Sequence, residues 1–451
     1  MNRREVIKAG AAAAALGFPA IVPSSVFGQN APGNRINVGA IGIGRISRIH
    51  DLPQVWRHDD AQVVAVCDLD SRRLLAGRQL VDRTYSEKTG RTWSGTRIYT
   101  DHRALLANRD IDAVLISTPD HQHARLAIQA VQAGKDVYLQ KPASLTIAEG
   151  RRMADAVAAT DRILQIGSQQ RGQDPWPQFH KACELVRNGR IGALRHVEVG
   201  LPGDPSGPEA GPQPIPANLN YDAWLGSTPE AYYTEIRVHP QNSLTDRPGW
   251  LRCEQFGAGM ITGWGAHHVD IAHWGMDMER SGPVEIWGNA EFPASGLWDV
   301  HGPFETHARY ANGVTMTISG ALPNGVKFIG ADGWIFVTRS GAVTPSDPSG
   351  PQIDPLTASN PAILTSEIGP DGVRLARTPE QHRNWLDSIK SRAAPAAPAE
   401  VGHRACSTCL LHWIAMRTGR RLRWDPAAER FIGDDEANAM LSRPQRRGYA
   451  I

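Results

Sequence analysis

A glycine-rich turn contains the first residues whose types and spacing could do chemistry. Residues 42–47 read Gly-Ile-Gly-Arg-Ile-Ser and follow an apolar, β-branched run at residues 35–41. Glycines in such a turn let backbone N–H groups and the N-terminus of the next helix approach a pyrophosphate. Ser47 replaces the usual third glycine, and its small side chain still allows close packing of helix on strand. The turn predicts a dinucleotide site formed by Gly42, Gly44, Arg45 and Ile46.

An acidic residue follows the next apolar run. Residues 63–67 are apolar, and Asp68 comes directly after them. A carboxylate at the end of the second strand of such a unit is placed to accept hydrogen bonds from a ribose diol, which favours NAD. Arg72 and Arg73 lie just beyond and could instead pair with the 2′-phosphate of NADP. The sequence therefore predicts NAD and leaves NADP open.

Polar segments follow two further apolar runs. Residues 117–123 read Ser-Thr-Pro-Asp-His-Gln-His, and residues 140–142 read Gln-Lys-Pro after the run at 136–139. Doubly wound sheets bind ligands at the carboxyl ends of their parallel strands. We therefore expect both segments at the dinucleotide site, with contacts from Thr118, Pro119, His123, Gln140 and Lys141.

The elements that must position these residues alternate between strands and helices. This alternation predicts an α/β fold that starts with a Rossmann domain at residues 34–156, a doubly wound parallel sheet with helices on both faces. Beyond it the strands become two-sided and long Gly/Pro loops separate them. That change predicts an α+β substrate domain at residues 157–365, with a mostly antiparallel open sheet covered by helices on one face.

The remaining residues, 366–451, are expected to pack back on these domains. They contain a helical pair, at about 380–392 and 400–419, and an irregular tail. Residues 345–370 are rich in Pro, Gly, Ser and Asp and are predicted to form an irregular loop. The length of 451 residues agrees with two domains, because single cores stop growing near roughly 250–300 residues.

Composition excludes some classes of partner. The chain has 48 Lys+Arg against 46 Asp+Glu, a net charge of +2, which provides no basic footprint for nucleic acid or an anionic membrane face. Its 41% hydrophobic content argues against disorder. A small molecule is the expected partner.

The first 33 residues are expected to lie outside the fold. Arg3 and Arg4 form a paired-arginine region, and an Ala-rich apolar stretch follows to residue 22. This pattern is typical of a twin-arginine export signal and linker. A transmembrane anchor is the alternative, although the stretch is shorter than the roughly 20 apolar residues that span a bilayer. We expect a periplasmic protein with no membrane partner beyond export.

The cysteines form no disulfide framework. There are five, and Cys406 and Cys409 are spaced as C-x-x-C, which is also a redox or zinc pattern. Because the surrounding residues are helical in pattern and no second pair exists, we interpret them as core thiols.

The turn, Asp68 and the two strand-end segments together resemble the Gfo/Idh/MocA family, named for glucose–fructose oxidoreductase and inositol dehydrogenase. The resemblance covers nearly the whole chain after the signal. In that family the second segment reads Glu-Lys-Pro, and its lysine contacts the nicotinamide ribose and the reacting hydroxyl. The resemblance implies this role for Lys141, and an exposed surface lysine is the alternative. Gln140 departs from the family glutamate, which removes a carboxylate next to Lys141.

The family's second motif is Asp-x-x-x-His on a helix. His267 falls on the family histidine and is the candidate proton acceptor, whereas Gly263 stands where the family has aspartate. A core role for His267 is the alternative. His268 and Asp270 could be interpreted with His267 as a metal cluster, but consecutive helical residues point about 100° apart. No metal is predicted.

Sugar-facing residues are expected in segments rich in donors, acceptors and flat apolar faces. Similar segments occur in the sugar-facing domain of related family members, and Trp224 could instead only cap the core. The candidates are Gln169, Arg171, Trp224, Arg237, His239, Trp250 and His268.

The resemblance implies hydride transfer between NAD(P) and a CHOH group of a carbohydrate or cyclitol. A cofactor that stays bound through the cycle is expected, together with a homo-oligomer formed through the sheet of the second domain. Redox-neutral glycoside cleavage by transient oxidation is the rival activity. A non-catalytic sugar- or cofactor-binding protein is a third possibility, supported by the replacements at Gln140 and Gly263.

Overall fold

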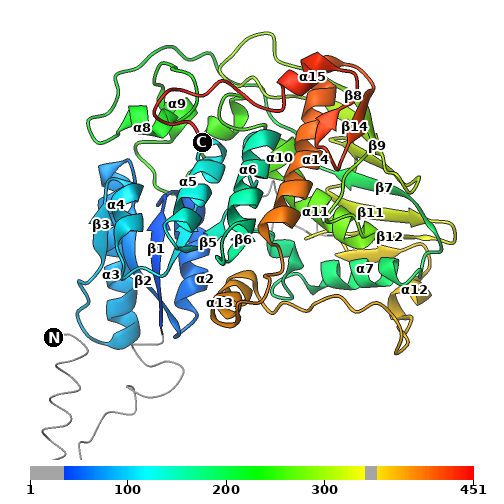
Figure 1. The fold of residues 1–451 in the computed structure, drawn as a ribbon, viewed down its shortest axis with the longest axis horizontal. Coiled ribbons are helices and arrows are strands. Elements are labelled where there is room, and N and C mark those ends of the chain that lie inside the picture. Colours follow the sequence, from blue (N-terminus) through cyan, green and yellow to red (C-terminus); the bar gives the residue numbers. More distant parts are fainter. Residues whose placement is uncertain (1–34, 341–352) are drawn as a thin grey trace, which may run out of the picture.

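The computed structural model describes residues 35–340 and 353–451, so the predicted export signal lies outside the described residues (Figure 1). The N-terminal domain is built on a parallel sheet with strand order β3-β2-β1-β4-β5-β6. Its strands are β1 (Ile36–Ile41), β2 (Ala61–Cys67), β3 (Arg97–Tyr99), β4 (Ala113–Ile116), β5 (Asp136–Leu139) and β6 (Leu164–Ile166). Its helices are the π-helix η2 (Ser47–Asp51), α2 (Leu52–Trp56), α3 (Ser71–Thr89), α4 (His102–Ala107), α5 (Asp120–Gln132) and α6 (Ile147–Ala158).

This sheet confirms the Rossmann prediction. The central strands β4 and β5 are buried at every position, as parallel strands covered on both faces must be. The parallel sheet extends past the predicted boundary at residue 156, because β6 pairs with β5.

The second domain contains a nine-stranded sheet with the order β13-β12-β11-β7-β10-β9-β8-β14-β15. All its described ladders are antiparallel except that between β7 and β10, which confirms the mostly antiparallel prediction. The strands are β7 (Leu194–Gly200), β8 (Glu285–Ala290), β9 (Phe304–Arg309), β10 (Thr315–Ser319), β11 (Gly325–Gly330), β12 (Trp334–Val337), β13 (Leu356–Ala358), β14 (Leu422–Asp425) and β15 (Arg430–Phe431).

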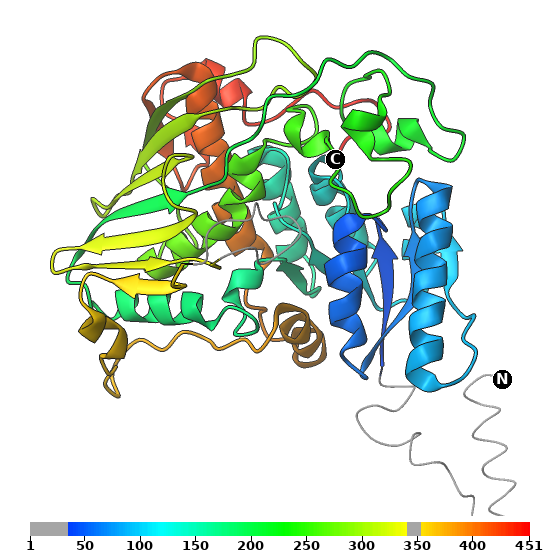
Figure 2. The same cartoon turned by 180° about the vertical axis from the view of Figure 1, so that it is seen from behind.

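Helices cover one face of this sheet and separate it from the Rossmann domain, as Figures 1 and 2 show. The long ones are α7 (Pro177–Arg187), α11 (Gly265–Met276) and α14 (Ala399–Thr418). Strand β9 alternates between buried and more exposed side chains, which is the pattern of a sheet with one covered face. The other helices of this part of the chain are η3 (Gln169–Arg171), α8 (Tyr221–Leu225), α9 (Glu235–Val238), η4 (Trp250–Arg252), α10 (Met260–Gly263), α12 (Pro361–Thr365), α13 (Gln381–Ser391) and α15 (Asp435–Ala439).

Two segments predicted to be irregular contain regular elements. Within residues 345–370, β13 pairs with β12 and α12 follows it, while residues 341–352 lie outside the described part of the chain. The C-terminal tail contributes β14, β15 and α15. The first prediction was wrong because β12 offers β13 a partner edge, and the second because β14 pairs with β8, which lies far away in the sequence. The predicted helical pair is confirmed as α13 and α14.

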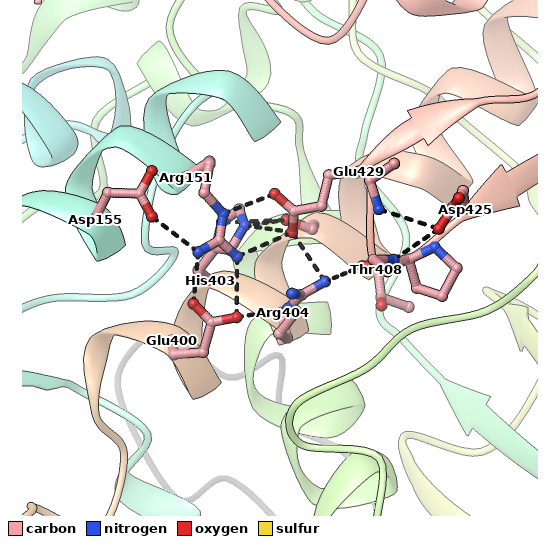
Figure 3. A network of polar contacts seen from close by, with 12 residues as sticks. Arg151, Asp155, Glu400, His403, Arg404, Thr408, Asp425 and Glu429 are labelled. Atoms are coloured by element: carbon pink, nitrogen blue, oxygen red, sulfur yellow. Dashed lines mark hydrogen bonds and ion pairs between the residues drawn. The ribbon is translucent and has the colours of Figure 1, made fainter. Parts of the chain in front are cut away.

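A polar network ties the two domains together (Figure 3). Arg151 on α6 contacts Glu400 on α14 at 2.7 Å and Glu429, in the turn before β15, at 2.8 Å. Burial alone would raise the pKa of both glutamates, but hydrogen bonds from their neighbours, Arg151 among them, outweigh it and hold each pKa at about 2. The C-terminal segment therefore packs back on the Rossmann domain through ionised groups.

The five cysteines are free and buried, which confirms the interpretation as core thiols. Burial raises the pKa of the Cys406 thiol to about 11, so this thiol stays protonated at neutral pH. Among the described helices, none is long and apolar enough to cross a membrane.

Candidate active site

A cavity of about 900 Å³ lies at the carboxyl ends of the Rossmann strands. Segments of the second domain at residues 217–220 and 246–251 and the C-terminal Tyr449 complete its wall. The volume is at the upper end of the range for small-molecule sites. The predicted residues that line it are Gly42, Gly44, Arg45, Ile46, Asp68, Thr118, Pro119, Gln140, Lys141, Trp224, His239 and Trp250.

The glycine turn leaves room for a phosphate group. Gly42 has φ 84°, and a Cβ atom there would lie 2.8 Å from the carbonyl oxygen of Ser117, so only glycine fits. A Cβ on Gly44 would meet nothing within 4 Å, so that side of the turn is open. Helix η2 begins directly after the turn. The turn therefore fits a dinucleotide pyrophosphate.

Asp68 is held in place at the end of β2. Its carboxylate accepts hydrogen bonds from the backbone N–H of Ile43 at 2.7 Å and of Asp70 at 2.9 Å. Arg73, one of the two arginines considered for a 2′-phosphate, is 5% exposed. Its guanidinium donates to the backbone carbonyls of Pro240, Ser243 and Leu244. Asp68 and Arg73 thus both line the cavity, and the Arg73 guanidinium is already bonded to three carbonyls of the second domain.

Of the two proton-handling candidates, Lys141 lines the cavity and His267 does not. Lys141 Nζ donates to the Gly263 carbonyl at 2.9 Å, and His267 lies one helical turn after Gly263. Burial, followed by the positive charges of Arg339 and Lys141, lowers the pKa of His267 well below its ordinary value. Its buried Nδ1 atom has no hydrogen-bond partner among the described residues. His267 is therefore a neutral, buried ring, and it does not itself line the cavity.

Five predicted residues other than His267 also do not line the cavity, because their side chains have other partners. Arg171, predicted to bind sugar, instead pairs with Asp270 at 2.7 Å and with Glu279 at 2.7 Å. His268 contacts Asn324 at 2.8 Å. His123 contacts the carbonyls of Thr118 and Pro142. Arg237 stacks on Tyr232. Gln169 is buried in η3.

Sequence reasoning missed Asp120. It lies at the start of α5, is buried, and lines the cavity. Burial raises the pKa of its carboxyl, and the positive charge of Lys141 partly offsets that rise. Its place within the strand-end segment at 117–123 was the available signal. Asp120 is thus a second titratable group beside Lys141.

Sequence reasoning also missed a cluster of His50, Asp51 and His382, whose possible metal-ligating atoms lie within 4.8 Å of one another. The Asp51 carboxylate already accepts hydrogen bonds from Ser117 Oγ at 2.6 Å and from Gln140 Nε2 at 2.7 Å. Hydrogen bonding therefore accounts for the cluster without an ion. No local pattern pointed to it, since His382 is far from the other two in the sequence.

Family models match most of the chain. A model described as an oxidoreductase family with an NAD-binding Rossmann fold matches residues 36–168. A second, the C-terminal alpha/beta domain of an oxidoreductase family, matches residues 207–343 and 365–451. The chain belongs to the Gfo/Idh/MocA oxidoreductase family. The resemblance found in the sequence motifs is thereby confirmed, and with it an NAD-binding fold.

This Gfo/Idh/MocA oxidoreductase matches curated relatives over part of their length. It is 33% identical over 157 residues to the myo-inositol 2-dehydrogenase of Thermotoga maritima, covering 35% of this chain and 42% of the relative. It is 29% identical over 260 residues to a glycosyl hydrolase family 109 protein of Stenotrophomonas maltophilia, covering 56% of this chain and 52% of the relative. The chain thus spans about half or less of these relatives.

Solved structures share the fold. The WlbA dehydrogenase of Bordetella pertussis, in complex with NADH and UDP-GlcNAcA, superposes with a TM-score of 0.57 at 18% identity. The match covers 87% of this chain and 99% of that chain. The two-domain arrangement is therefore common to both proteins.

Proposed function

We propose that this Gfo/Idh/MocA oxidoreductase transfers a hydride between NAD and a CHOH group of a carbohydrate or cyclitol. The contact between Lys141 and the Gly263 carbonyl carries the proposal, since it brings the lysine to the last residue of α10, shortly before α11, the helix that carries His267. NAD, when bound, accepts or returns the hydride. The protein's own task is to bind the polyol and to move its hydroxyl proton.

Two side chains act on the hydroxyl group in this proposal: Lys141 in the cavity lining and His267 on α11. Lys141 donates a hydrogen bond to the reacting oxygen and stabilises the negative charge that develops there. His267, the histidine that the family resemblance singles out, is the proposed proton acceptor, and its lowered pKa keeps the ring neutral as that role requires. Trp224, His239 and Trp250, which line the same cavity, supply the flat faces and the polar group that a sugar ring needs.

We propose NAD as the cofactor in preference to NADP. Asp68 presents a carboxylate to the cavity, and a 2′-phosphate beside it would meet an unfavourable negative charge. The Arg73 guanidinium already donates to three carbonyls, so it has fewer hydrogens left to bind a 2′-phosphate. Tighter binding of NADP than of NAD to the purified protein would reverse this assignment.

The direct experiment is a substrate panel. Purified protein with NAD is offered inositols, aldoses and sugar acids, and NADH formation is followed by absorbance. Saturable NADH formation with one class of polyol is the expected result. A protein that binds NADH but reduces no NAD with any polyol would favour a non-catalytic role instead.

The family 109 relative favours a second candidate, redox-neutral glycoside cleavage. In that reaction oxidation at C3 acidifies the C2 hydrogen, elimination expels the aglycone, water adds, and the hydride returns to C3. The same cofactor site serves both activities. Release of nitrophenol from a nitrophenyl glycoside, with no net NADH, would identify this candidate.

We also propose that the protein works after export, with its cofactor retained. The paired arginines Arg3 and Arg4 support export to the periplasm. Segment 217–220 helps enclose the cavity and bonds to the start of α3, where the Ser71 N–H donates to the Asn218 carbonyl at 2.8 Å. Export of an Arg3→Lys/Arg4→Lys variant at the normal level would contradict the first point. NAD lost on gel filtration would contradict the second.

We also propose that the protein forms a homo-oligomer through the sheet of the second domain. On the face of the sheet away from the helices, Trp287 stacks on His307 with ring centroids 5.4 Å apart. Arg421 lies 3.8 Å from the centroid of the Trp287 ring. Such an aromatic and guanidinium surface is typical of interfaces. Light scattering should give at least twice the monomer mass, and a Trp287→Glu variant should be smaller.

A further inference from the structure

A buried carboxylate joins two of the strand ends that form the cavity. Asp51, at the end of η2, has no exposed surface. Its Oδ2 accepts a hydrogen bond from Ser117 Oγ at 2.6 Å, and its Oδ1 accepts one from Gln140 Nε2 at 2.7 Å. Ser117 follows β4, Gln140 follows β5, and both line the cavity. One side chain therefore fixes the separation of the two segments that carry the candidate cofactor contacts.

A charged histidine from the C-terminal segment balances Asp51. His382 on α13 places Nε2 3.4 Å from Asp51 Oδ1 and Nδ1 2.8 Å from Glu380 Oε1. Burial alone would lower the pKa of His382, but the two carboxylates outweigh it and raise that pKa, so the ring is an imidazolium at neutral pH. His50 Nδ1 lies 2.9 Å from Asp51 Oδ1. The Asp51 carboxylate is thus ionised and surrounded by donors.

The position of Gln140 explains why a carboxylate belongs at Asp51. Gln140 stands where the family has glutamate, immediately before Lys141. Two carboxylates 2.7 Å apart in a buried site would repel, and one would have to bind a proton. An amide at position 140 instead donates to Asp51. Position 140 therefore lacks a carboxylate, and the nearby carboxylate is that of Asp51, to which Gln140 is hydrogen-bonded.

We propose that Asp51 is a positioning residue of the hydride-transfer site: through Ser117 and Gln140 it holds the ends of β4 and β5 and thereby sets the place of Lys141. This inference rests on the proposed function. Asp51 itself is separated from the cavity by the residues it holds, so it contacts neither cofactor nor substrate. Its effect on turnover passes through Gln140 and Lys141.

A charge-exchange cycle tests the proposal. Asp51→Asn removes the anion, and Gln140→Glu creates a buried pair of carboxylates. Each should lower kcat by about 10- to 100-fold, the scale expected when a catalytic group moves by roughly 1 Å. The double variant Asp51→Asn/Gln140→Glu again pairs one carboxylate with one amide and should recover kcat to within about fivefold of wild type. A merely structural role would change the melting temperature without this rescue in kcat.

Asp60→Asn is the matched control. Asp60 also holds α13 to the Rossmann domain, through Arg383 at 2.8 and 3.0 Å and through Lys390, but it is bonded to neither Ser117 nor Gln140. This variant should melt at a lower temperature with unchanged kcat. Independent, unrescued losses in the two single variants, or an equal loss of kcat in Asp60→Asn, would overturn the proposal.

NADH affinity separates a failure of this proposal from a failure of the proposed function. If no polyol is turned over, the dissociation constant of NADH is measured for the same variants by fluorescence. Each single change should weaken NADH binding by about fivefold or more, and the double variant should restore it. Additive losses would overturn the positioning role.

Metal analysis tests the competing explanation, a metal site in place of the positioning role. Stoichiometric zinc that is lost in Asp51→Asn would replace the positioning role by a metal site at His50, Asp51 and His382.

Discussion

Replacement of Arg171 distinguishes a ligand-binding role from a structural one. The guanidinium is 3% exposed and forms a two-pronged contact with Asp270, at 2.7 and 2.8 Å, and a further contact with Glu279 at 2.7 Å. Arg171→Met keeps much of the side-chain volume but leaves Asp270, which is 1% exposed, without its main counter-charge. Breaking a buried pair from one side costs about 3–5 kcal/mol of unfolding free energy. For a domain of this size that loss lowers Tm by about 6–20 °C.

The assay compares thermal melting with steady-state kinetics. Because Arg171 does not line the cavity, KM for the polyol should stay within about twofold of wild type. Arg97→Met is the control: Arg97 pairs with Asp110 at the surface, with side chains 54% and 68% exposed, and such pairs contribute about 0–1 kcal/mol. An Arg171→Met protein with unchanged Tm and a KM raised tenfold or more would refute the structural role and restore the prediction of sugar binding.

Three further outcomes follow from the site and the domain contacts. Lys141→Ala and His267→Ala should each lower kcat by about 100-fold or more with NADH binding retained, and near-normal turnover in both would move the chemistry elsewhere. Asp68→Ala should weaken NAD binding by about 1.5–3 kcal/mol, measured by calorimetry, because a charged acceptor for the ribose is lost; equal affinity would remove Asp68 from the site. The two glutamate partners of Arg151 have folded-state pKa values of about 2 against an ordinary 4.5, so their stabilisation is full above about pH 4.5 and is lost as pH falls toward 2. Melting temperatures of an Arg151→Met variant should fall less steeply over that range than those of wild type, and parallel curves would contradict this assignment.

The sequence alone was sufficient for the fold class and for many of the residues that line the cavity. Buried parallel strands are short, continuous apolar runs, so β1, β2, β4 and β5 could be located from composition and length. The residues after such strands must meet at one edge of the sheet, and the turn at residues 42–47 and the segments at 117–123 and 140–142 all contribute to the cavity lining. The Gfo/Idh/MocA resemblance then singled out Lys141 and His267.

Only the tertiary structure decided which polar side chains face the cavity and which hold the protein together. Arg171 looked like a sugar ligand, but its partner Asp270 is 99 residues away in the sequence. Asp51 meets Gln140, 89 residues away, and His382 on a helix of the C-terminal segment. Likewise, β13 forms only because β12 offers it an edge. Periodicity along a chain records which face of an element is apolar. It does not record which distant donor reaches a given acceptor, because that depends on how the domains pack.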